Sequence, residues 1–201
     1  MAYFFCYNKD MTKLIKNVFN QEDIITLYRN LACFSGEGHK IKETGRYIIA
    51  STQLDRIPGI MDVISKIETM ATEYAGKPMK MATVGYHLYK KCFGLPFLPP
   101  HIDEYAGEVV FDYQLDSTIS WPIKINKELY VLENNDAIMF NGESVPHSRP
   151  ESNFIEFEHV LMFIVNLISE DHWNNFFVVN PKDQDTISNE IKQIREDEEN
   201  W

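Results

Sequence analysis

Residues 134–150 read NNDAIMFNGESVPHSRP, and this stretch decides the predicted fold because it alternates turns with short apolar strands. Asn134-Asn135 and Asn141-Gly142 tolerate turn conformations, and each pair precedes a segment with a β-type pattern. The same pattern of short strands separated by turns continues on both sides of this stretch. We expect strands at residues 80–89, 107–115, 120–125, 128–132, 136–140, 145–149 and 159–168. Many short strands separated by turns predict a sandwich or a barrel.

The first part of the chain has a helical pattern instead. Residues 21–34 carry apolar side chains at helical spacing, and acidic residues in the first turn complement the helix dipole. A second helix is expected to follow Pro58 and to end near Gly76, with Met61, Ile64 and Ile67 in its buried stripe. Residues 46–50 are expected to form a short strand between the two helices.

No linker, repeat or low-complexity segment divides the sequence, so we predict one α+β domain over residues 1–201. Residues 1–79 are expected to be mainly helical support and residues 80–170 the β core. Residues 171–201 form a C-terminal extension, with a polar helix predicted over residues 183–195.

The formal net charge of −11 argues against a nucleic-acid partner, because phosphates are contacted mainly by Lys and Arg. A basic or zwitterionic substrate is compatible with this charge. Cys6, Cys33 and Cys92 are odd in number and scattered, which favours a reducing, cytoplasmic setting. No stretch has the apolar length needed to cross a bilayer, so no membrane partner is predicted. The oligomeric state leaves no signal in the sequence.

Three side chains have the spacing of a metal site. His101 and Asp103 are two residues apart, so both point to the same side of an extended segment. His147 follows four predicted strands later, which lets the chain cross the sheet and return with a third ligand. Two His and one carboxylate on one face of a metal leave the opposite positions open, as an iron(II) site that binds O₂ requires.

Further blocks surround these ligands in a fixed order: Tyr89-Lys90-Lys91, His101-Ile102-Asp103, Trp121-Pro122-Ile123, residues 136–140 and Pro146-His147-Ser148-Arg149. The segment from Tyr86 to Asn166 thereby resembles the 2-oxoglutarate- and iron(II)-dependent oxygenases, and most closely a small subgroup with many bacterial and phage members. The resemblance implies a double-stranded β-helix (jelly roll) with supporting N-terminal helices. It also implies Fe(II) as the metal held by the two histidines and the aspartate, and 2-oxoglutarate and O₂ as co-substrates.

One position departs from the family pattern. Many members carry an Arg or Lys downstream of the second His, where it binds the far carboxylate of 2-oxoglutarate. Here residues 157–159 are Phe-Glu-His, with no basic residue of that kind. Arg149 is the expected substitute, since a planar guanidinium pairs bidentately with a carboxylate. Tyr89 is expected to add a hydroxyl donor, and His159 is a further candidate.

These patterns predict an oxygenase that hydroxylates a C–H bond of a small molecule, an amino acid or a peptidyl side chain. The alternative is a cupin-like, metal-binding jelly roll whose chemistry does not use 2-oxoglutarate, which the missing basic residue favours. A non-catalytic binding module is the third class, and the intact ligand set argues against it. Substrate contacts in such folds come from variable loops, so the sequence does not identify the substrate.

Overall fold

The computed structural model describes residues 12–34, 38–50, 54, 57–103 and 107–172. Its two α-helices are α1 (Gln21–Phe34) and α2 (Ile60–Ala75), and its short 3₁₀ turns include η1 (Lys42–Thr44) and η3 (Lys91–Phe93). The strands are β1 (Lys13–Ile15), β2 (His39–Ile41), β3 (Arg46–Ala50), β4 (Met79–Lys90), β5 (Leu98–His101), β6 (Val109–Ser117), β7 (Ile123–Ile125), β8 (Glu128–Tyr130), β9 (Ala137–Phe140), β10 (His147–Arg149) and β11 (His159–Ser169).

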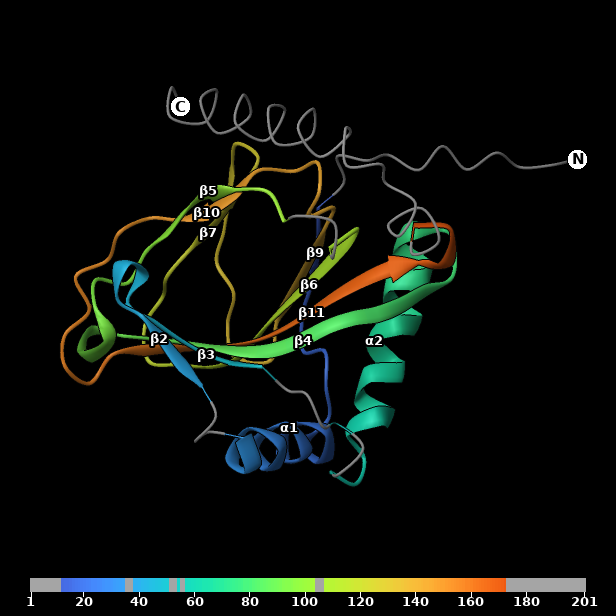
Figure 1. Cartoon of the computed structure of the whole chain (residues 1–201), viewed down its shortest axis with the longest axis horizontal. Coiled ribbons are helices and arrows are strands. Elements are labelled where there is room, and N and C mark those ends of the chain that lie inside the picture. The colour runs from blue at the N-terminus through green and yellow to red at the C-terminus, as the bar shows by residue number, and fades with distance from the viewer. Residues whose placement is uncertain (1–11, 35–37, 51–53, 55–56, 104–106, 173–201) are drawn as a thin grey trace, which may run out of the picture.

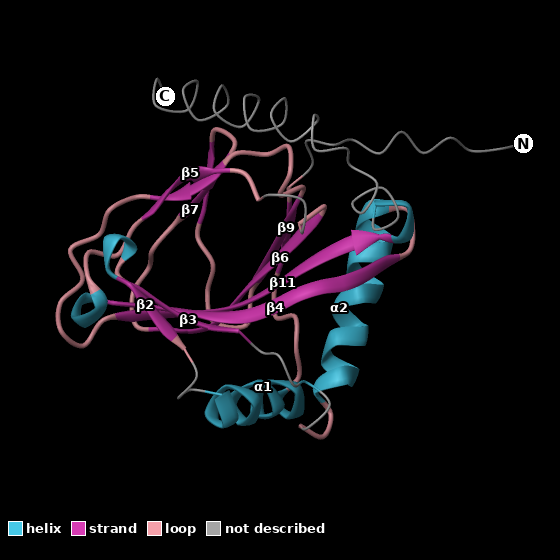
Figure 2. Ribbon diagram, viewed as in Figure 1, coloured by secondary structure: helices cyan, strands magenta, loops and turns pink. Residues whose placement is uncertain are grey.

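The strands form two antiparallel sheets that face each other (Figures 1 and 2). The larger sheet has the order β1-β9-β6-β11-β4-β3-β2, and the smaller one has the order β5-β10-β7-β8. Helices α1 and α2 lie against the outer side of the larger sheet, away from the smaller sheet (Figure 1). Two opposed antiparallel sheets with helices on one side are the architecture that the predicted jelly roll requires.

Side chains alternate between the two faces of the long strands, apart from the register shifts at two β-bulges, and this alternation separates the core into two layers. In β6, Val109, Phe111 and Tyr113 pack against the helices. Val110, from the opposite face of the same strand, packs between the two sheets with Ile138. Because side chains of a strand alternate between faces, every second residue of β4, β6 and β11 points into the space between the sheets. This inner space contains the candidate site.

The predicted elements agree with the structure in most places. The helix over 21–34, the strand over 46–50 and the series of β-strands are confirmed. The N-terminal segment is less helical than predicted, because β1 and β2 join the edges of the larger sheet there. The predicted polar helix over 183–195 lies outside the described residues. In the part of the chain that the structure describes, no helix has the length and apolarity to span a bilayer.

One prediction about α2 is wrong. Ile64 and Ile67 are buried as expected, but Met61 is 47% exposed. Val63 is buried in its place, at 1% exposure. The reason is the helical period, since Ile60, Ile64 and Ile67 fix the inward face and a residue directly after Ile60 is rotated by about 100° from it.

Candidate metal centre

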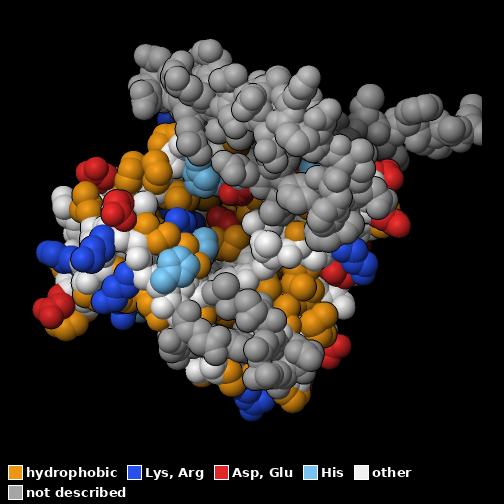
Figure 3. All heavy atoms as spheres, viewed as in Figure 1, with side chains coloured by type: hydrophobic (Ala, Val, Ile, Leu, Met, Phe, Trp, Pro, Cys, Tyr) orange, Lys and Arg blue, Asp and Glu red, His pale blue; other side chains and the backbone are white. Residues whose placement is uncertain are grey.

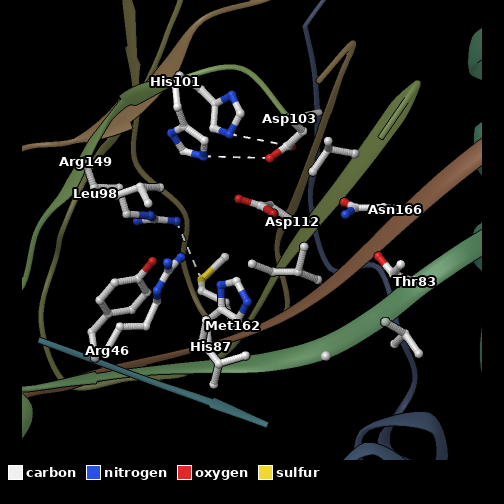
Figure 4. A pocket seen from close by; sticks show the side chains of 17 residues that line it. Arg46, Thr83, His87, Leu98, His101, Asp103, Asp112, Arg149, Met162 and Asn166 are labelled. Carbon is white, nitrogen blue, oxygen red and sulfur yellow. Dashed lines mark hydrogen bonds and ion pairs between the residues drawn. The ribbon is translucent and has the colours of Figure 1, made fainter. Parts of the chain in front are cut away.

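His101, Asp103 and His147 meet at one end of the space between the sheets (Figure 4). His101 ends β5 and His147 begins β10, and the two residues are direct cross-strand partners. Their ring centroids lie 4.2 Å apart. Each Nε2 atom lies 3.7 Å from an oxygen of the Asp103 carboxylate. The structure therefore brings the three predicted ligands together, with one ligand atom of each within 4.8 Å of the others.

Both histidines are oriented by the backbone just before them. The Nδ1 atom of His101 lies 2.8 Å from the Pro99 carbonyl oxygen, and that of His147 lies 3.2 Å from the Val145 carbonyl oxygen. A proton on Nδ1 that is donated to a carbonyl leaves the lone pair on Nε2, which is the arrangement of histidines that ligate metals. Burial lowers the pKa of both imidazoles to about 4, so each is neutral at physiological pH.

Asp103 is positioned by a close backbone contact. Its N–H donates a hydrogen bond to the Gly142 carbonyl oxygen at 2.7 Å. A Cβ atom on Gly142 would lie only 2.9 Å from the Asp103 Oδ2 atom and 2.5 Å from a methyl group of Val110. Glycine is therefore required here by space. Two imidazole nitrogens and one carboxylate oxygen fit a divalent transition metal, and small movements suffice because ligands about 2.1 Å from a metal at right angles are about 3 Å apart.

A cavity of about 250 Å³ extends from the triad into the molecule. Its lining comes from four strands of the larger sheet and two of the smaller one. Figure 3 shows histidine, acidic and basic side chains gathered around a hollow on the face that it depicts. A cavity of this size suits a small molecule or one side chain of a peptide.

One end of the cavity is cationic. Arg149, on β10, is 1% exposed, and its Nη1 donates to the Trp121 carbonyl oxygen at 2.8 Å. The Trp121 ring lies beneath the guanidinium, 5.1 Å from Cζ. Arg46, on β3, is the cross-strand partner of Tyr89 and interacts with its side chain. The Nε atom of Arg46 is buried without a hydrogen-bond partner.

The side chains of Arg46 and Arg149 lie on the same side of the cavity (Figure 4), and Tyr89, whose side chain is hydrogen-bonded to Arg46, lines the cavity with them. Within the described residues neither Arg46 nor Arg149 forms a salt bridge. Arg149 is buried and Arg46 is half-buried, and two like charges without a salt-bridge partner repel one another, so this arrangement favours an anionic ligand between them. Arg149 and Tyr89 are thus brought to the cavity as predicted, whereas Arg46 was missed because nothing distinguishes it from a surface arginine in the sequence.

The opposite side of the cavity is acidic and polar, formed by Asp112, Asn166 and Thr83 (Figure 4). Burial raises the pKa of Asp112 to about 7. His87 also lines the cavity, and burial together with the charge of Arg46 lowers its pKa to about 3. Sequence reasoning missed Asp112, although a single acidic residue inside the apolar run of residues 109–115 was a usable signal.

His159 does not take part in the site, which corrects one prediction. Its Nε2 atom lies 3.0 Å from the Asp116 Oδ2 atom, and its side chain does not line the cavity. The cavity residues of β11 are Met162, Ile164 and Asn166. The two-residue period of the strand places His159 on the other face, which explains why proximity in sequence was misleading.

Solved structures share this fold. The non-heme alpha ketoglutarate dependent epimerase SnoN from nogalamycin biosynthesis matches with a TM-score of 0.66 and 14% identity, over 81% of this chain and 79% of that chain. A Pseudomonas putida prolyl-4-hydroxylase matches with a TM-score of 0.60 and 10% identity, over 79% and 92%. A Trichoplax adhaerens prolyl hydroxylase matches with a TM-score of 0.62 and 12% identity, over 82% and 86%.

No protein-family model matches the chain, and no curated protein matches it in sequence. The likeness is therefore one of fold. It confirms the predicted α+β jelly roll and places this chain in the same structural class as several 2-oxoglutarate- and iron(II)-dependent oxygenases.

Proposed function

We propose that the protein is a non-haem iron(II)- and 2-oxoglutarate-dependent oxygenase. The observation that carries this proposal is the convergence of His101, Asp103 and His147, with both Nε2 atoms 3.7 Å from the carboxylate. Two neutral imidazoles and a carboxylate on one side of a metal are the ligand set of non-haem iron oxygenases. These three residues would hold Fe(II).

Arg149, Arg46 and Tyr89 would bind the far carboxylate of 2-oxoglutarate. Arg149 is suited to this role because its position is fixed from two sides, by the Trp121 carbonyl and the Trp121 ring. Arg46 contributes a buried Nε–H that has no protein acceptor. A carboxylate placed between two guanidinium groups and a hydroxyl would satisfy donors that the protein leaves unsatisfied.

When bound, the iron and 2-oxoglutarate would supply the activation of O₂ for oxidation of a substrate C–H bond. The protein's own part is to hold the reactants in place and to limit access by water. His101 and His147 are kept in one tautomer by their Nδ1 contacts, and the carboxylate of Asp103 is kept in place by the Gly142 contact. The substrate is proposed to be a small molecule, an amino acid or a peptidyl side chain, acted on in the cytoplasm.

The proposal is tested by measuring O₂-dependent conversion of 2-oxoglutarate to succinate with added Fe(II). Wild-type protein is expected to form succinate slowly without a substrate, and His101→Ala is expected to lose this reaction together with iron binding. His39→Ala is the matched control, because His39 is an exposed histidine outside the triad.

The cupin-like alternative keeps the same ligands and differs in the co-substrate. It is favoured by the absence of a basic residue at positions 157–159, and the arginine pair argues against it. Iron binding by wild-type protein without any effect of 2-oxoglutarate would support this alternative and contradict our proposal. Absence of iron binding would exclude both functions.

A further inference from the structure

The cavity contains a buried carboxylate that the protein leaves without a partner. Asp112 lies on β6, between β9 and β11 in the larger sheet, and is 6% exposed. Among the residues that the structure describes, no side chain or backbone group forms a hydrogen bond or salt bridge with its carboxylate. Burying a charge without a partner is costly, so a retained one calls for an explanation.

The next inward-facing residue of the same strand shows that the fold is able to satisfy a polar group there. Gln114 is 2% exposed, and its Nε2 donates to the Leu132 carbonyl oxygen at 2.8 Å. Asp112 differs from Gln114 because it lines the cavity and points into it (Figure 4). Its carboxylate is therefore available to a ligand.

Two further oxygen-bearing side chains lie on the same side of the cavity. Asn166 on β11 is the cross-strand partner of Thr83 on β4 and of Val110 on β6, which makes Asp112 its diagonal neighbour. Figure 4 shows Asn166 and Thr83 on the side of the cavity away from the two arginines, with Asn166 nearer to Asp112 than Thr83 is. Neither side chain forms a hydrogen bond with another described residue.

The charge of Asp112 is only weakly compensated. Arg149 and Arg46 both act to lower its pKa, yet burial outweighs them and raises it to about 7. No Lys or Arg nitrogen of the described residues lies within salt-bridge distance of it. A cation that binds beside Asp112 would therefore relieve an existing electrostatic cost.

We propose that Asp112 and its diagonal neighbour Asn166 form a subsite for the protonated amine of a small-molecule substrate. An ammonium group donates N–H hydrogen bonds only, and Asp112 and Asn166 offer a carboxylate and an amide oxygen as acceptors. The net charge of −11 favours the approach of a cation. As a statement about the substrate, this inference rests on the proposed oxygenase function. As a statement about a cation site, it is independent of iron.

The subsite predicts a strong preference for amines over neutral molecules of the same shape. A neutral analogue leaves Asp112 buried and unpaired, and sites that hydrogen-bond a polar group reject analogues that lack it. We expect the ammonium member of a matched pair to bind at least about 10-fold more tightly. Cadaverine with 1,5-pentanediol, and Nα-acetyl-L-lysine with Nα-acetyl-L-norleucine, are suitable pairs, because only the first member of each carries an ammonium group.

The experiment measures dissociation constants of these four probes by calorimetry, on the full chain with and without anaerobic Fe(II) and 2-oxoglutarate. Wild type is expected to prefer each ammonium probe, and Asp112→Asn is expected to lose the preference. Asp116→Asn is the matched control, because Asp116 lies on the same strand but pairs with His159 outside the cavity. It is expected to keep the preference.

Several results would overturn the inference. Equal binding of the ammonium and neutral probes by wild type would overturn it. An undiminished preference for the ammonium probes in Asp112→Asn would also overturn it. If Asp112→Asn does not fold, the same measurement is made on Asn166→Leu. A smaller preference for the ammonium probes in Asn166→Leu would support the inference, and an unchanged preference would contradict it. Tighter binding of a lysine-containing peptide than of Nα-acetyl-L-lysine would overturn the assignment to a small molecule.

Binding of 2-oxoglutarate to wild type separates the two proposals. If 2-oxoglutarate fails to bind but the amine preference depends on Asp112, the cation subsite stands and the oxygenase function fails. If 2-oxoglutarate binds and the amine preference is absent, the oxygenase function stands and the subsite is wrong.

Discussion

The two ends of the cavity carry opposite charges, and they are built differently. At the cationic end, Arg149 is held by Trp121 and Arg46 interacts with Tyr89, so protein contacts fix where the positive groups lie. At the acidic end, Asp112 has no such contact among the described residues. The three candidate metal ligands line the same cavity, and His101 and Asp103 lie apart from both charged groups in Figure 4.

In an ordinary protein core, buried opposite charges pair with each other. Here Asp112 and the two arginines line one cavity without forming a salt bridge. The separation is maintained by strand positions, since the arginines come from β3 and β10 and the aspartate from β6. This separation supports the proposal that the cavity holds two ligand groups of opposite charge beside the candidate metal ligands.

The largest change in iron affinity is expected from removing one of the three candidate metal-ligating residues. His147→Ala should reduce iron affinity by more than about 100-fold, because loss of a direct ligand exceeds the loss from its supporting contacts. Equilibrium dialysis with Fe(II) measures it. His159→Gln serves as a control and should bind iron like wild type, and equal losses in both variants would contradict the assignment of the ligands.

Removing a cation should weaken only the cationic end. Arg149→Ala should raise the dissociation constant of 2-oxoglutarate by roughly 10- to 100-fold, since a hydrogen bond to a charged group contributes about 1.5–3 kcal/mol. Arg46→Ala should have a smaller effect in the same calorimetric titration, because Arg149 remains. If either variant binds 2-oxoglutarate as tightly as wild type does, the assignment of that arginine to the carboxylate of 2-oxoglutarate is contradicted.

A single methyl group added at Gly142 is expected to disturb the candidate metal centre. Gly142→Ala should displace Asp103 and lower iron affinity by about 10-fold, in line with the effect of losing a supporting contact of a metal ligand. It should also destabilise the protein by about 1–3 kcal/mol through overpacking against Val110. Iron titration and urea denaturation measure the two effects, and unchanged iron affinity would show that the Gly142 contact does not position Asp103.

The last prediction concerns the acidic end and an effect that is confined to high pH. Asp112 has a pKa of about 7 in the folded protein, above its usual value, so the folded state binds this proton more tightly than the unfolded state. The penalty for an ionised Asp112 is absent below the unfolded pKa and is complete once the pH exceeds about 7. Asp112→Asn should therefore stabilise the metal-free protein at pH 8 by roughly 1–3 kcal/mol and have little effect near pH 4.

Thermal denaturation of wild type and Asp112→Asn at several pH values tests this prediction. A stability difference that does not change with pH would show that Asp112 is paired and that the two ends of the cavity are not held apart. Asp116→Asn is the control for a general effect of removing an acidic residue.

The sequence predicted the fold well because its signals are local. Alternating strands, the turns at Asn134-Asn135 and Asn141-Gly142, and the helical spacing of residues 21–34 act within a few neighbours. The edge strands β1 and β2 were missed because each has only three residues, and β1 in addition depends on pairing with the distant strand β9. Met61 was wrongly assigned to the buried face of its helix. It is apolar but directly follows the buried Ile60, and consecutive residues of a helix point in different directions.

The candidate site was only half predictable. The metal ligands are marked by their spacing and by the surrounding blocks of the resemblance, and Arg149 lies beside one of them. Arg46 and Asp112 come from strands whose position relative to the triad is set by the sheet order, which the sequence does not encode locally. His159 was wrongly included because the face of a strand, rather than proximity in the chain, decides what enters the cavity.

The most direct test of the account is an anaerobic titration of the iron-loaded protein with 2-oxoglutarate, followed by visible absorption. We expect a weak metal-to-ligand charge-transfer band that saturates in wild type, needs more 2-oxoglutarate in Arg149→Ala and is absent in His101→Ala. Iron bound by wild type at saturating 2-oxoglutarate without such a band would contradict the claim that His101, Asp103 and His147 form an oxygenase centre that uses this co-substrate.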